Sequence, residues 1–159
     1  MDGSAATHIP TFDLPATTGR NLSLDSFLDK VPLGIVFLTD LDEDRGMIDV
    51  LNQSFAEFGR ERSQLLVVAP VAIDELRRFV DDNDIVMPIL ADASGAMARD
   101  FGAHDESGKP RCMAVVATAE GRLVSRLDVL SESDVVETLL NELRDLDLGG
   151  EVEPASDEE

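Results

Sequence analysis

Cys112 is the only cysteine of this 159-residue chain, and it directly follows Arg111. A thiolate is the nucleophilic form of cysteine, and a neighbouring cation lowers the thiol pKa and so favours that form. A single cysteine allows neither an intramolecular disulfide nor a cysteine zinc cluster. The pair therefore suggests two interpretations: thiol redox chemistry with a partner thiol, or a small buried side chain beside a surface arginine.

Three aspartates alternate along a short acidic stretch, at Asp40, Asp42 and Asp44. Alternating carboxylates resemble the start of a calcium loop, but an EF-hand also needs glycine at its sixth position and glutamate at its twelfth. Those positions hold Arg45 and Leu51. An EF-hand is therefore not expected. The three aspartates stay weak candidates for cation binding, and the other interpretation is a solvated acidic loop.

His8 and His104 are the only histidines, and they lie far apart in the sequence. A metal site needs more ligands than one histidine, so both are predicted to be surface residues. The chain contains no Gly-rich dinucleotide motif, no P-loop and no serine-centred elbow. We therefore expect neither a metal nor an organic cofactor.

The charge balance is strongly acidic, with 33 Asp and Glu against 13 Lys and Arg and a formal net charge of -20. Such a surface repels nucleic-acid phosphates and anionic membranes, so neither is an expected partner. Hydrophobic residues make up 43% of the chain, which is enough for an ordinary core. Concentrated salt would screen the repulsion within the acidic shell, as in halophilic proteins.

The lysine-poor, aspartate-rich composition resembles that of haloarchaeal cytosolic proteins. The first ten residues lack the basic and apolar regions of a signal peptide. No apolar run approaches the roughly 20 residues that span a bilayer. A cytoplasmic location and a halophilic character are therefore predicted.

The apolar pattern predicts an α/β domain in which strands and helices alternate, which favours a parallel sheet. A turn-rich stretch suggests an edge hairpin near the N-terminus. A flexible lead-in over 1–10 and a disordered acidic tail over 149–159 are expected to flank the domain at 11–148. The predicted elements are a hairpin over 11–24, a helical turn over 24–28, strands over 31–39, 65–69, 87–91, 113–117 and 123–129, and helices over 47–58, 73–80, 93–101 and from Ser131 onwards.

The order of short motifs resembles the alkyl hydroperoxide reductase/thiol-specific antioxidant group, the peroxiredoxins, between about Pro10 and Leu146. This resemblance implies a thioredoxin-like fold: a central mixed sheet flanked by helices, with an N-terminal hairpin. It also implies an antioxidant oxidoreductase of the redoxin type and a homodimer. The motifs are Phe12-Asp13-Leu14-Pro15 with Gly19, Leu22-Ser23-Leu24 with Phe27, Leu33 to Phe37, Pro88 to Asp92, Ala98 to Gly102, Arg111 before Val115-Val116, and Gly121 to Val124.

The resemblance also implies where an active site would lie. The family places a Pro, a Thr or Ser, and the peroxidatic Cys around the start of a helix, and adds an Arg from a later strand. These positions correspond here to Thr39, Glu43, Gly46 and Arg111, so only the arginine is matched. Glycine carries no nucleophile, and the acidic neighbours would raise a thiol pKa rather than lower it.

The sequence therefore predicts a peroxiredoxin-like protein without cysteine thiol-peroxidase activity that acts as a binding or regulatory domain. Its partner would be a second copy or another protein. The alternative is an antioxidant enzyme that reduces peroxides through Cys112 and a partner thiol reductant. Because neighbouring strand residues face opposite sides, Cys112 is expected to face away from the site if Arg111 faces it. A third hypothesis is a cation-binding module built on the acidic loop.

Overall fold

The central sheet of the computed structural model has five strands in the order β5-β4-β3-β6-β7. The structure describes residues 8–128 and 131–152, with side chains up to residue 146. The β3-β4 and β4-β5 pairs are parallel and the β3-β6 and β6-β7 pairs are antiparallel, which confirms the mixed sheet. Their bounds are β3 (Leu33–Phe37), β4 (Gln64–Ala69), β5 (Ile89–Ala91), β6 (Met113–Ala117) and β7 (Leu123–Leu127).

The predicted edge hairpin is present as a separate two-stranded sheet of β1 (Asp13–Pro15) and β2 (Asn21–Ser23), followed by the 3-10 turn η2 (Leu24–Ser26). The loop of the hairpin contacts the main sheet at β5. There, the Thr17 Oγ1 accepts a hydrogen bond from the Ile89 N–H at 3.0 Å. The hairpin thereby covers one face of the central sheet.

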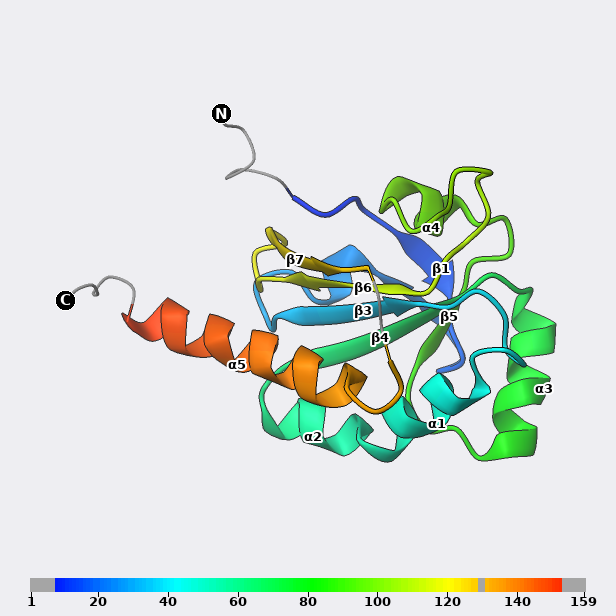
Figure 1. Ribbon diagram of the computed structural model, residues 1–159, viewed down its shortest axis with the longest axis horizontal. Coiled ribbons are helices and arrows are strands. Elements are labelled where there is room, and N and C mark those ends of the chain that lie inside the picture. The colour runs from blue at the N-terminus through cyan, green and yellow to red at the C-terminus, as the bar shows by residue number, and fades with distance from the viewer. Residues whose placement is uncertain (1–7, 129–130, 153–159) are drawn as a thin grey trace.

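Helices cover both faces of the sheet and form a three-layer arrangement (Figure 1). One face packs against α1 (Arg45–Gln53), α2 (Phe55–Arg60), α3 (Ile73–Asn83) and α5 (Val135–Val152). The other face packs against α4 (Ala96–Asp100) and the N-terminal hairpin. β3 and β6 are buried at every residue because they lie between the two layers. No helix in the described ranges is long and apolar enough to cross a membrane.

Two predicted helices differ from the observed ones. The single helix expected over 47–58 is divided at Ser54, which ends α1 and begins α2. The helix expected over 93–101 begins only at Ala96, because Gly95 adopts a left-handed φ of 76° and turns the chain first. The Asp92 carboxylate then accepts hydrogen bonds from the Met97 and Ala98 N–H groups and fixes the start of the helix.

Both chain ends extend the ordered domain beyond its predicted limits. Residues 8–10 are not a loose lead-in: the Ile9 N–H donates to the Gly121 carbonyl at 2.9 Å, and the Ile9 side chain is buried. An apolar side chain that can join the core holds this segment in place. The last helix continues to Val152, past the predicted end at 148. The remaining tail positions, 153–159, and residues 1–7 of the lead-in lie outside the described residues.

Candidate functional site

The turn that follows β3 is organised by the Asp44 carboxylate. Its Oδ2 accepts hydrogen bonds from the Thr39 N–H at 2.7 Å, the Thr39 hydroxyl at 2.9 Å and the Asp40 N–H at 3.2 Å. The Asp40 carboxylate in turn accepts from the N–H groups of Asp42 at 2.7 Å and Glu43 at 3.1 Å. Local side-chain-to-backbone bonds of this kind hold a turn in one shape. Asp44 and Asp40 are therefore structural residues of the turn.

Two of the three candidate cation ligands are thus already engaged within the turn. Asp44 and Asp40 point carboxylate oxygens at main-chain N–H groups of their own loop. Within the described ranges, no group of three His, Cys, Asp or Glu side chains is arranged to hold a metal ion. His104 lies in a loop, where its Nδ1 lies 3.1 Å from the Asp105 carbonyl, while His8 is exposed beside Arg122. The geometry brings none of these residues together as a metal site.

Gly46, to which the resemblance assigned the position of the reactive cysteine, is the second residue of α1. A Cβ atom built on Gly46 would coincide with the carboxylate of Glu132, whose two oxygens and Cδ are its nearest neighbours. Glu132 lies just before α5, far from Gly46 in the sequence. The space that a cysteine side chain would use is therefore filled by a carboxylate from another element.

A hydrogen-bonded turn holds Glu132 in this place. The Ser131 hydroxyl donates to the Asp134 carboxylate at 3.2 Å, and the Ser131 carbonyl accepts from the N–H groups of Asp134 and Val135. The pairing of Ser131 with Asp134 agrees with the helix start predicted there, although α5 itself begins at Val135. An open pocket of about 420 Å³ lies beside this turn and is lined by Arg126, Leu127, Asp128, Ser131, Asp134, Val135 and Thr138.

Arg111, the one matched family position, is paired with Asp128 at the end of β7. Its Nη2 donates to the Asp128 carbonyl at 3.0 Å and lies 3.5 Å from the Asp128 carboxylate. Both side chains are more than a third exposed, at 39% and 59%. An exposed pair of this kind contributes little to stability. Its geometry matches the interpretation of Arg111 as a paired arginine near the surface.

Cys112 is half-buried and packs against the cluster formed by β3, β6, α1 and α5. Burial and then the negative charge of Asp44 raise the pKa of its thiol to about 11. A thiol with this pKa is almost entirely protonated at neutral pH and is a poor nucleophile. Cys112 therefore lies on the α1 side of the sheet, near enough to Asp44 to be affected by its charge, while Arg111 turns to Asp128.

The chemistry that this arrangement supports is limited by its charges. The turn and its surroundings carry carboxylates at Asp40, Asp42, Glu43, Asp44 and Glu132. The Arg45 guanidinium is engaged with Asp49 at 3.4 Å and lies over the Phe79 ring. Negative charge raises the pKa of a nearby thiol and repels anions. The site therefore disfavours a thiolate at this turn.

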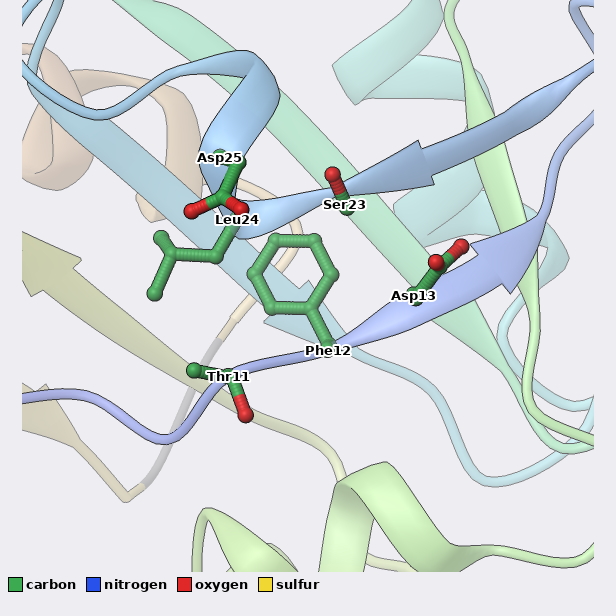
Figure 2. A pocket seen from close by; sticks show the side chains of 6 residues that line it. All are labelled: Thr11, Phe12, Asp13, Ser23, Leu24 and Asp25. Atoms are coloured by element: carbon green, nitrogen blue, oxygen red, sulfur yellow. The ribbon is translucent and has the colours of Figure 1, made fainter.

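A second hollow lies on the opposite face of the sheet, next to the N-terminal hairpin. It is open, has a volume of about 400 Å³ and is lined by residues that flank β1 and β2: Thr11, Phe12, Asp13, Ser23, Leu24 and Asp25 (Figure 2). In this view the Phe12 ring lies between the side chains of Asp13 and Asp25. The lining of the hollow contains no cysteine, histidine or arginine.

Sequence reasoning missed two residues of the site. Asp44 was considered only as a cation ligand, whereas its carboxylate accepts hydrogen bonds from Asp40 and Thr39, four and five residues earlier. The Asx-turn rule does not predict these bonds, because it places the donor two residues after the aspartate. Glu132 carried no signal in the sequence, because its contact with Gly46 depends on how α1 and α5 pack together. The one local indication was Gly46 itself, because a weak helix former in the first turn of α1 suggests that another group packs closely against this position.

Comparison with known proteins places these observations in a family. Among solved structures, the fold is similar to peroxidoxin BcpB of Mycobacterium tuberculosis, with a TM-score of 0.77, 19% identity, and 88% of this chain and 96% of that one covered. It is also similar to thioredoxin peroxidase I of Plasmodium yoelii, with a TM-score of 0.79, 17% identity, and 96% and 94% covered. For peroxiredoxin Q of Xanthomonas campestris the TM-score is 0.76 and the identity 18%, with 89% of this chain and 98% of that one covered.

A search of curated proteins gives no match. The sequence itself matches the AhpC/TSA family over residues 5–125, which is more than half of the chain. The mixed sheet, the N-terminal hairpin and the helices on both faces agree with that match. This chain therefore belongs to the AhpC/TSA family and has a peroxiredoxin fold.

Proposed function

We propose that this member of the AhpC/TSA family has lost thiol-peroxidase chemistry and acts as a binding or regulatory domain. The observation that supports the proposal is at position 46, which the resemblance assigns to the reactive cysteine: it is a glycine, and a Cβ atom there would clash with the Glu132 carboxylate. Peroxide reduction needs a thiolate that attacks the peroxide oxygen, and that thiolate needs cations or helix N–H groups around it. Carboxylates surround this turn instead.

The alternative, an antioxidant enzyme that uses Cys112 and a partner thiol, has less support. With a thiol pKa of about 11, Cys112 is present as thiolate in a fraction of only about 10⁻⁴ at pH 7. Arg111 is the neighbouring cation, but it is directed to Asp128. Burial is the larger of the two causes that raise the pKa of this thiol, and it also limits the access of a partner thiol.

A peroxide-consumption assay in molar potassium chloride with a thiol reductant tests the proposal. The wild-type protein should consume hydrogen peroxide no faster than buffer with reductant, and the Cys112→Ser variant should match it. Turnover well above that baseline in the wild type, absent in Cys112→Ser, would establish the alternative and overturn the proposal.

A second copy of the chain is the partner that we propose for the domain. Family membership supports this proposal, and β7 forms one edge of the central sheet with no further strand beside it in the described residues. One solved relative, a Plasmodium yoelii Prx1a modified at its N-terminus, forms an octamer described as artifactual, which concerns that protein alone. Sedimentation velocity in molar salt should give the mass of a dimer; a monomer at all concentrations would reject it.

A further inference from the structure

Gly46 occupies a position where a helix ordinarily carries a side chain. Glycine is among the weakest helix formers, so its presence in the first turn of α1 calls for a structural reason. Its counterpart Gly59, inside α2, has no atom within 4 Å of a built Cβ. At Gly46 the three nearest atoms all belong to the Glu132 carboxylate. The two glycines therefore differ in what lies next to the position of a Cβ atom.

No carboxylate of α1 or of its N-cap residue caps the free N–H groups at the start of the helix. Its first turn contains no acidic residue, and the side chain of the N-cap residue Asp44 makes no capping hydrogen bond to the helix. That carboxylate is directed back to Thr39 and Asp40. The N-terminal end of a helix carries a partial positive charge and attracts an anion. Glu132 places a carboxylate beside this end of α1.

The Glu132 side chain comes from a hydrogen-bonded turn that leads directly into α5. Hydrogen bonds within 131–134 shape the turn, and α5 begins directly after it. The first residues of α5 then anchor the turn to the core, because Val135 and Leu139 are buried. The carboxylate is therefore presented to α1 by a rigid element, although the side chain itself is exposed.

We propose that Glu132 is an internal plug: its carboxylate occupies the space above Gly46 at the N-terminus of α1 and closes it to other anions. Glycine at position 46 then leaves room for the Glu132 carboxylate, and the turn over 131–134 is coupled to α1 through this contact. The inference concerns the closure of this site alone and does not depend on whether Cys112 reacts with peroxide.

Thermal unfolding of four variants and the wild type tests the coupling. Gly59→Ala, the matched control, should raise the midpoint by roughly 2 to 4 °C, because alanine favours the helix and meets no neighbour. Gly46→Ala should raise it less, or lower it, because the new methyl group displaces the Glu132 carboxylate. In a Glu132→Ala background, adding Gly46→Ala should give the same gain as Gly59→Ala. An equal gain from Gly46→Ala in both backgrounds would overturn the proposal.

Thiol alkylation measures the closure directly. In a Cys112→Ser background, Gly46→Cys leaves one thiol, at the plugged position. Adding Glu132→Gln, which removes the charge and keeps the size, should speed its alkylation by about tenfold for each unit by which the thiol pKa falls. The gain should be larger for anionic iodoacetate than for neutral iodoacetamide. Equal rates with and without Glu132→Gln, for both reagents, would show that Glu132 does not close the site.

Discussion

The Asp44 carboxylate gives the clearest test of how the turn after β3 is built. Asp44→Ala removes the acceptor of three hydrogen bonds, from the Thr39 N–H, the Thr39 hydroxyl and the Asp40 N–H. A hydrogen bond to a charged acceptor contributes about 1.5–3 kcal/mol when it is buried. Because this site is half-buried to exposed, we expect about 1 kcal/mol for each bond and a total loss of about 2–3 kcal/mol.

Differential scanning calorimetry in molar potassium chloride should therefore show a midpoint roughly 4 to 12 °C lower for Asp44→Ala. Asp44→Asn is the control, because it keeps one carbonyl acceptor and loses only the charge, at a cost of about 1 kcal/mol. Both variants should also lower the pKa of the Cys112 thiol, because the Asp44 charge is one of its two causes. The pKa should stay above 9.0, since the larger cause, burial, persists. A midpoint of Asp44→Ala within about 1 °C of the wild type would refute the assigned role of the carboxylate.

Three further predictions concern salt, pH and the C-terminus. The midpoint should rise steadily as potassium chloride approaches molar levels, because salt screens the repulsion of a net charge of -20; a flat or falling midpoint would reject the halophilic character. The folded state holds the Cys112 proton more tightly than the unfolded state, so stability should fall between pH 9.0 and about 11, and less so in Cys112→Ser; equal pH profiles would contradict the raised pKa. Removal of residues 153–159, which follow the end of α5 and are mostly acidic, should leave the melting curve nearly unchanged; a large loss of stability would show that this segment docks on the domain.

The fold was predictable because its signals are local. The unbroken apolar runs at Leu33–Phe37 and Met113–Ala117 are buried on both faces of the sheet. Such runs are typical of strands that are covered on both sides. Gly121, in the turn before β7, has a left-handed φ of 88°, which agrees with the hairpin predicted there. The boundaries were less predictable, since Ser54 divides one apolar helical pattern into α1 and α2, and Gly95 delays the start of α4.

For the candidate site, the sequence indicated which residue types stand at the family positions but not which contacts their side chains make. The resemblance assigned the Pro, Thr or Ser, and Cys positions of the family to Thr39, Glu43 and Gly46, none of which carries a thiol. It could not show that Asp44 turns back to Thr39, since loop side chains have several acceptable partners. The contact between Glu132 and Gly46 joins residues that are distant in sequence, and no periodicity or spacing encodes a contact of this kind.

The reaction of Cys112 with hydrogen peroxide tests the central claim most directly, because it needs no knowledge of a reductant. The reduced wild-type protein is mixed with equimolar peroxide in molar potassium chloride, and the oxidised fraction of Cys112 is followed by mass spectrometry. Because the thiol pKa is about 11, Cys112 should oxidise no faster than a free cysteine in the same buffer. Oxidation to a sulfenic acid orders of magnitude faster than free cysteine would contradict the account and make this protein a one-cysteine peroxidase.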